Sequence, residues 1–119
     1  MTRVRVGIDL VQISRIAESL ALFGERFLRR VFTDGELAYA ARHPERLAAR
    51  FAAKEAAKKA LALDGIGWRE LEVVRAESGA CEILLHGSAR AAAGTSALAL
   101  SMSHEGDHAT AVVIAYDQC

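Results

Sequence analysis

An alanine-rich run over residues 45–63 constrains this chain more than any other feature, because eight of its nineteen residues are alanine. Alanine is the best helix former, and Pro44 immediately before the run suits the first turn of a helix. The run therefore predicts one long helix from Glu45 to about Leu63. Its alanines leave room for another backbone or a ligand to approach closely. A chain of 119 residues has the length of one domain, so we expect a single domain spanning 1–119.

The N-terminal segment predicts a strand followed by a helix. Residues 3–8 alternate in polarity, which is typical of a strand, and we expect that strand to end at Asp9. Apolar residues at helical spacing from Ile13 to Phe23 predict an amphipathic helix that ends at Gly24. A short apolar segment with two arginines then follows over residues 27–32.

The remaining segments predict helices before the long helix and mainly strands after it. Thr33 and Glu36 have the spacing of a capping box, which predicts a short helix to about Arg42. After the long helix we expect a turn over 64–67, strands over 71–75 and 82–86, a helix over 88–93, and strands over 97–103 and 109–116. This order predicts an α+β fold with a mainly antiparallel sheet packed against the long helix.

The composition argues against several classes of protein. Only 6% of residues are aromatic, which argues against a base-stacking surface for nucleic acid. No apolar run approaches the roughly 18 residues that a membrane span needs, and the first residues lack the apolar core of a signal peptide. The two cysteines, Cys81 and Cys119, make neither a metal cluster nor a disulfide framework. We therefore expect a soluble cytoplasmic protein that binds neither nucleic acid nor membrane.

Charge is distributed unevenly along the chain. Residues 1–60 carry 12 basic and 7 acidic residues, and residues 61–119 carry 3 and 8. A basic half could steer an acidic partner, or the two halves could neutralise each other in the fold. The three lysines, Lys54, Lys58 and Lys59, all lie within six residues. Such compact charges suit phosphate oxygens, whereas the alternative is a solvated helical face with pairs such as Glu55–Lys59.

Three polar positions are candidates for chemistry, and each has a structural alternative. Asp9 is either the cap of the following helix, which this residue alone favours, or a metal or acid–base group. Glu55 beside Lys58 and Lys59 could hold a phosphate with its magnesium, or it could form exposed salt bridges. His104 could take part in catalysis, although a lone histidine is more often structural.

The chain resembles the holo-acyl-carrier-protein synthases, the small members of the 4′-phosphopantetheinyl transferase superfamily, over nearly its whole length. The resemblance is carried by Gly-x-Asp at 7–9, Phe-x-x-Lys-Glu-Ala-x-x-Lys at 51–59 and Ser-Met-Ser-His at 101–104. Two departures are visible. Ala62 stands where the family usually has glycine, and Ala80-Cys81 stands where it usually has Lys-Pro.

This resemblance implies transfer of 4′-phosphopantetheine from coenzyme A to a serine of apo acyl carrier protein, releasing 3′,5′-ADP. It implies that Asp9 and Glu55 hold magnesium and that both act in catalysis with Lys59. It further implies contacts with the coenzyme from Lys59, from Arg50 or Lys54, and from Ser103 and His104. Glu55 through a water, or a metal-bound water, would accept the serine proton, with His104 as the second choice.

The resemblance also implies partners. Family members are homotrimers with sites between subunits. Their carrier proteins are acidic, so the basic residues on or beside the first helix become candidate contacts: Arg15, Arg26, Arg29 and Arg30. Two rival functions remain, a paralogue that binds coenzyme A or carrier protein without transfer, and a trimeric scaffold with an inherited motif.

Overall fold

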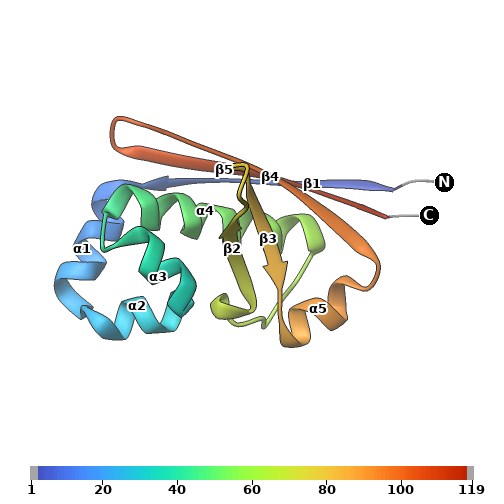
Figure 1. The fold of residues 1–119 in the computed structure, drawn as a ribbon, viewed down its shortest axis with the longest axis horizontal. Coiled ribbons are helices and arrows are strands. Elements are labelled where there is room, and N and C mark those ends of the chain that lie inside the picture. The colour runs from blue at the N-terminus through green and yellow to red at the C-terminus, as the bar shows by residue number, and fades with distance from the viewer. Residues whose placement is uncertain (1–2, 118–119) are drawn as a thin grey trace.

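A computed structural model describes residues 3–117 and confirms the predicted α+β class (Figure 1). The elements in chain order are β1 (Val4–Gln12), α1 (Ile13–Phe23), α2 (Glu25–Val31), α3 (Asp34–Ala40), α4 (Pro44–Leu61), the 3-10 helix η1 (Trp68–Glu70), β2 (Leu71–Arg75), β3 (Cys81–Leu85), α5 (Gly87–Ala93), β4 (Ser96–Glu105) and β5 (His108–Asp117). Cys119 lies outside the described residues. No helix in the described part is both long and apolar enough to cross a bilayer.

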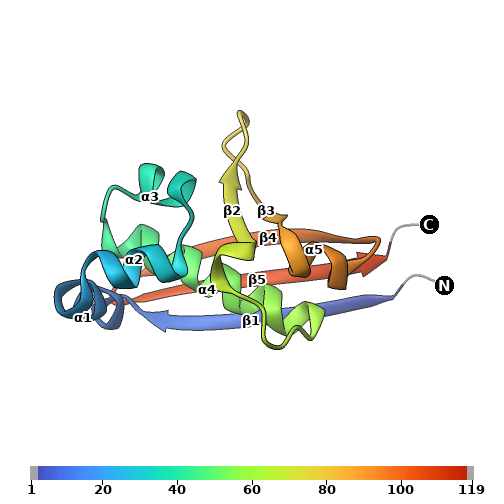
Figure 2. The same ribbon diagram turned by 90° about the horizontal axis from the view of Figure 1, so that it is seen from below.

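Two antiparallel sheets are present. The larger has the strand order β1-β5-β4, and the smaller pairs β2 with β3. Helix α4 lies against one face of the larger sheet, and Figure 1 shows the other helices on that same side. Seen from below in Figure 2, the β2–β3 hairpin projects sideways from the body of the molecule. The predicted packing of a long helix against an antiparallel sheet is therefore confirmed.

Strand β1 is longer than the sequence predicts. Its pairing with β5 continues through Asp9, opposite Ala111, to Gln12, opposite His108. The prediction that the strand ends at Asp9 is therefore wrong, and so is the interpretation of Asp9 as a helix cap, because Gln12 occupies the cap position of α1. Strand β4 is likewise longer than expected and includes His104.

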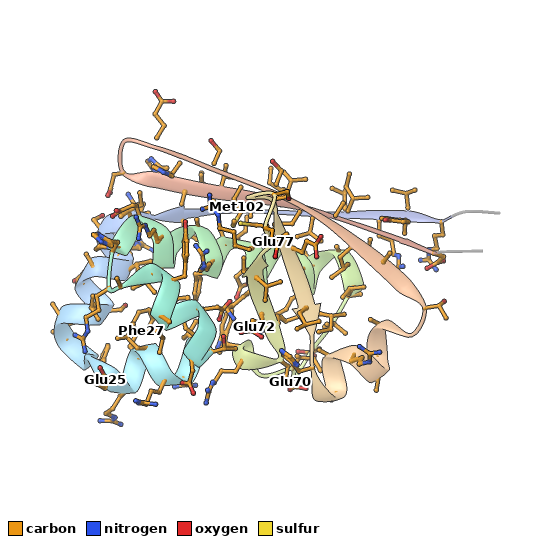
Figure 3. The ribbon with its side chains drawn as sticks, viewed as in Figure 1. Glu25, Phe27, Glu70, Glu72, Glu77 and Met102 are labelled. Atoms are coloured by element: carbon orange, nitrogen blue, oxygen red, sulfur yellow. The ribbon has the colours of Figure 1, made fainter. Side chains whose placement is uncertain are left out.

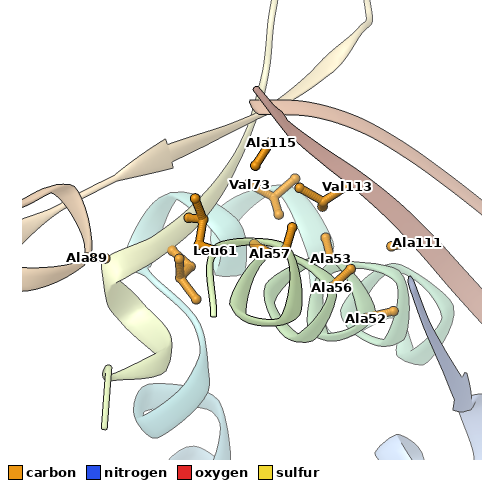
Figure 4. Packing of buried hydrophobic residues seen from close by; sticks show 12 residues of the cluster. Ala52, Ala53, Ala56, Ala57, Leu61, Val73, Ala89, Ala111, Val113 and Ala115 are labelled. Atoms are coloured by element: carbon orange, nitrogen blue, oxygen red, sulfur yellow. The ribbon is translucent and has the colours of Figure 1, made fainter. Parts of the chain in front are cut away.

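Small side chains allow α4 to lie directly on the larger sheet. Figure 4 shows alanines of α4 packed against Ala111, Val113 and Ala115 of β5. At Gly7, an added Cβ would lie 1.9 Å from the carbonyl oxygen of Ala56. Glycine removes that clash, so the backbones of β1 and α4 come into direct contact. This contact holds the inward-facing residues of β1 beside the middle of α4.

The opposite face of β1 is apolar and exposed. Its side chains belong to Val4, Val6, Ile8 and Leu10, which are 60–65% exposed. No helix of the described residues covers this face. Phe23, the last apolar residue of α1, is also 57% exposed, whereas Ile16 of the same helix is buried. Gly24 ends α1 as predicted.

The capping box at the start of α3 is present, and it has a second role. Thr33 and Glu36 cap each other's main-chain N–H groups as predicted. Glu36 is also 1% exposed and accepts hydrogen bonds from Lys54 and from the main-chain N–H of Val73. One carboxylate therefore connects α3, α4 and β2.

Candidate active site

A groove of about 680 Å³ lies between β1, α1 and α4. Asp9 and Glu55 both line it, although they are separated by 46 positions in the chain. Asp9 reaches the groove because it lies two residues after Gly7 on the face of β1 that contacts α4. We call this hollow, which Arg15, Phe51 and Trp68 also line, the carboxylate groove.

Lys59 makes an ion pair with one of these carboxylates. Its Nζ lies 3.2 Å from Asp9 Oδ1 and donates to the carbonyl oxygen of Ile8 at 2.9 Å. The Lys59 side chain is 55% exposed and that of Asp9 is 17% exposed. Lys59 therefore contacts strand β1 as well as solvent. The alternative that the sequence left open, in which this lysine is only part of a solvated helix face, does not describe it.

The carboxylate of Glu55 has no hydrogen-bond or ion-pair partner among the described residues. It is half-buried and faces the carboxylate groove from the middle of α4. No cluster of three or more His, Cys, Asp or Glu side chains suited to a metal occurs in residues 3–117. Two carboxylates in one groove nevertheless fit magnesium, which takes one or two protein carboxylates and fills its remaining positions with phosphate oxygens and water.

Lys54 does not face the groove, and the prediction that it contacts the coenzyme is wrong. Its side chain is fully buried. Its Nζ donates to Glu36 Oε1 at 2.7 Å, to the Leu71 carbonyl at 2.5 Å and to the Trp68 carbonyl at 3.0 Å. All three ammonium protons are thus used inside the chain. Burial lowers the pKa of Lys54, and the neighbouring Glu36 opposes that effect.

Arg50 is also largely buried. Its guanidinium lies 4.2 Å from the centre of the Tyr39 ring, and its Nη1 donates to the Arg46 carbonyl at 3.4 Å. Burial lowers its pKa. The Nε of Arg50 is buried and has no hydrogen-bond partner among the described residues. A coenzyme contact by Arg50 stays a prediction.

Ser103 and His104 lie on opposite faces of the larger sheet. Ser103 pairs with Thr110 and points to the outer face, whereas His104 pairs with Ala109, whose side chain is buried on the α4 side. Strand β5 separates both residues from Asp9 on β1. The structure therefore does not bring Ser103 or His104 into the carboxylate groove of the same chain.

The four arginines expected to contact a partner divide into two groups. Arg15 lines the carboxylate groove, and Arg26 and Arg30 line an adjoining hollow of about 470 Å³, which we call the arginine groove. Arg29 points elsewhere and pairs with Glu25 at 3.4 Å and with Asp34 at 3.9 Å. Its charge is therefore offset within the chain.

Trp68, the single tryptophan, lies at the site although no sequence motif pointed to it. Its ring stacks on Phe51 with 4.9 Å between the ring centres, and Lys58 Nζ lies 3.6 Å from the ring centre. Trp68 lines both grooves, and so does Phe27, which is labelled in Figure 3. The sequence signal that could have indicated this residue is its position as the single tryptophan, directly after the glycine-containing turn over residues 64–67.

The fold and the groove together define a small α+β protein with two carboxylates and a lysine arranged around an open hollow. The model of the 4′-phosphopantetheinyl transferase superfamily matches residues 5–113. The chain therefore belongs to that superfamily, as the sequence resemblance indicates.

Individual relatives are similar over most of their length. A holo-[acyl-carrier-protein] synthase of Koribacter versatilis is 43% identical over an alignment 120 residues long, gaps included, that covers 93% of this chain and 96% of the relative. A solved complex with coenzyme A from Chronobacterium ammoniagenes has a TM-score of 0.88 and 34% identity, covering 98% of this chain and 99% of the other. A Bacillus anthracis enzyme in complex with CoA (3′,5′-ADP) has a TM-score of 0.82 and 27% identity, covering 99% of this chain and all of the other.

Proposed function

We propose that this protein transfers the 4′-phosphopantetheine group of coenzyme A to a serine of apo acyl carrier protein and releases 3′,5′-ADP. The observation that carries the proposal is the meeting of Asp9 and Glu55 in one groove, with Lys59 bonded to Asp9. The relatives that are named holo-[acyl-carrier-protein] synthases, and the solved relatives bound to coenzyme A or its nucleotide product, support the same conclusion.

In this reaction the serine oxygen bonds to the phosphorus of the pantetheine phosphate as the bridging bond of the pyrophosphate breaks. Asp9 and Glu55 would hold magnesium, which when bound neutralises charge on the pyrophosphate. Lys59 lies one helical turn after Glu55 and would place its ammonium against phosphate oxygens. Glu55 has no partner of its own among the described residues, so its carboxylate is free to take the serine proton through a water.

The carrier protein would bind at the arginine groove and at Arg15. Arg26 and Arg30, which form no ion pair within residues 3–117, lie beside the exposed ring of Phe23. An acidic carrier would be attracted to this surface, because opposite charge raises the rate of encounter. Arg29 is a weaker candidate, since Glu25 and Asp34 offset its charge.

The assembly would be a homotrimer with its sites between subunits. The outer face of β1 exposes four large aliphatic side chains in a row, and such a patch is typical of an interface. Ser103 opens onto the same outer face. If three copies bury these faces, Ser103 of one copy approaches another copy, which offers a role for a residue that lies away from Asp9, whereas His104 lies on the α4 side of the sheet.

Mass measurement of an apo carrier protein after incubation with this protein, coenzyme A and magnesium tests the function. We expect the carrier to gain one phosphopantetheine, and Asp9→Ala and Glu55→Ala each to reduce the rate more than tenfold, equivalent to about 1.4 kcal/mol of barrier. Binding of coenzyme A without any mass gain would indicate the non-catalytic paralogue, and neither binding nor gain would indicate a scaffold. A variant that retained over a tenth of the rate would contradict that residue's assignment.

Charge reversal at two neighbouring arginines tests the carrier surface. Arg26→Glu should raise the KM for the carrier several-fold, because it reverses a charge in the arginine groove. Arg29→Glu is the matched control on the same helix and should have a much smaller effect. Titration with salt should weaken carrier binding by the unmodified protein. Equal effects of the two substitutions would show that the arginine groove is not the docking surface.

A further inference from the structure

We propose that Lys54 is a positioning residue, whose buried ammonium holds the main chain at Trp68 and thereby fixes the indole that forms a wall of both grooves. This inference rests on the proposed function, because it assigns the two grooves to the coenzyme and the carrier. It gives a role to the one lysine of the cluster that no substrate can reach in this structure.

The contacts of Lys54 connect three separate segments. From the middle of α4, its Nζ reaches Glu36 in α3, the Trp68 carbonyl in η1 and the Leu71 carbonyl at the start of β2. Glu36 is fixed in turn, because its Oε1 accepts from the Thr33 N–H at 2.9 Å and its Oε2 from the Val73 N–H at 2.8 Å. A long lysine chain is flexible in water, but here each of its three protons has a defined acceptor.

Trp68 depends on such a support. Its indole forms no hydrogen bond within the described residues, so its place depends on stacking against Phe51, on the Lys58 ammonium over the ring and on its own main chain. The main chain is held from two sides. Lys54 holds the carbonyl of Trp68, and Glu70, two residues later, accepts from Ser88 and from the Ala89 N–H at the start of α5. Loss of the hydrogen bond from Lys54 would leave the main chain at Trp68, the first residue of η1, less firmly held.

The position of Lys54 in the chain links this support to the proposed chemistry. Adjacent residues of a helix point about 100° apart. Lys54 therefore faces the packed segments while Glu55 faces the carboxylate groove. The hydrogen bond from Lys54 to the Trp68 carbonyl fixes α4 against η1. It therefore also fixes the position of the Glu55 carboxylate relative to the indole of Trp68.

A buried ion pair is not needed to fill this space. Replacing such pairs with apolar or neutral residues of similar volume is often neutral or stabilising, because both charges lose their hydration on burial. The carbonyl contacts of Lys54 are what a hydrophobic replacement cannot reproduce. This property provides a variant that keeps the core filled and removes the support. A glutamine in place of Glu36 also loses one of the two N–H contacts, from Thr33 and from Val73, that the carboxylate accepts.

The double substitution Glu36→Gln/Lys54→Met is that variant. Trp68 is the sole tryptophan, so its fluorescence reports directly on its surroundings. We expect the folded variant to emit at longer wavelength and to be quenched more readily by acrylamide. The KM values for coenzyme A and for the carrier should each rise at least threefold, because the indole that lines both grooves is held less firmly. The value of kcat should change less than twofold, because Asp9 and Glu55 are unchanged.

Val73→Ala is the matched control, since it removes core volume on β2 and leaves every contact of Lys54 in place. It should lower the melting temperature and leave both the fluorescence and the KM values unchanged. If this control raises the KM values as much as the double variant does, general loosening explains the effect and the proposal fails. It fails equally if the double variant keeps the emission and both KM values of the unmodified protein.

Trp68→Ala keeps the proposal testable should the double variant not fold. It removes the wall directly and should reproduce the rise in both KM values, whereas unchanged values would overturn the assigned role of the indole. Absence of transfer by the unmodified protein would instead refute the proposed function. The fluorescence comparison would still decide, without any activity, whether Lys54 fixes Trp68.

Discussion

The two faces of β1 differ in the size and the exposure of their side chains. On the inner face, Gly7 brings its backbone against α4, and the facing residues of β5 are small and fully buried. On the outer face, alternate residues of the same strand are Val4, Val6, Ile8 and Leu10, and all are exposed. Because the side chains on the inner face are small, the backbones of β1 and α4 lie close together. This proximity places Asp9 and Glu55 in the same groove. The outer face keeps bulky aliphatic groups that no other part of residues 3–117 covers.

The difference indicates what each face is for. Small residues on both sides of a contact fix the distance between backbones closely, because little side-chain rearrangement is available to absorb a change. A row of exposed aliphatic side chains leaves apolar area in water, and each would contribute about 1.5–3 kcal/mol on full burial. We therefore propose that the inner face positions the carboxylate groove and that the outer face serves assembly.

The largest effect is expected from Gly7→Val on the inner face. Its Cβ would lie 1.9 Å from the Ala56 carbonyl oxygen, and no flexible side chain can move aside there. Overpacking of a core typically costs about 1–3 kcal/mol, and a clash with backbone falls at or above the upper end. Denaturant unfolding should show a large loss of stability or no cooperative fold. Val6→Ala, on the outer face of the same strand, should change the stability of the single chain little. Similar losses for the two would refute the contrast between the faces.

The next effect concerns assembly. Ile8→Glu puts a charge in the middle of the exposed aliphatic row, so burial between copies would leave that charge without water. We expect sedimentation equilibrium to show trimers for the unmodified protein and single folded chains for the variant, with loss of transfer activity. Leu84→Glu is the control, because Leu84 is 44% exposed on β3, outside the larger sheet. If Ile8→Glu remained trimeric, another surface would hold the assembly.

The smallest effect concerns the end of α4, the helix that covers the inner face. Ala62 follows this helix in the left-handed conformation with φ of 53°, and such a conformation costs an L-residue about 1–2 kcal/mol. Glycine adopts it freely but loses more entropy on folding. Ala62→Gly should therefore raise the free energy of unfolding by about 0.5–1 kcal/mol.

Ala91→Gly provides the comparison for that measurement. Ala91 is exposed inside α5, so glycine there should lower the free energy of unfolding by about 0.5–1 kcal/mol. Chemical denaturation of both variants checks the pair. A destabilised Ala62→Gly would mean that the unusual residue at this helix end is well accommodated.

Local patterns in the sequence determined much of this molecule. Helical spacing and Gly24 predicted α1 with its correct bounds, the capping box predicted the start of α3, and Pro44 with the alanine run predicted α4. These features depend on neighbours within one or two helical turns, so the chain itself specifies them. The motif residues Asp9, Glu55 and Lys59 were also accessible from the sequence, and the structure brings them to one side of the sheet.

Only the tertiary structure decided how neighbouring residues of those motifs divide their roles. Lys54 and Lys59 are both lysines of the same helix, and they differ in burial. Lys54 is fully buried against three acceptors, whereas Lys59 is exposed to solvent and contacts Asp9. Ser103 and His104 are adjacent, yet the pleat of β4 directs them to opposite faces. Strand β1 passes through Asp9 because β5 offers partners up to Gln12. Burial, facing and strand length depend on segments far away in the chain, and local sequence patterns do not specify which distant segment will cover a given side chain.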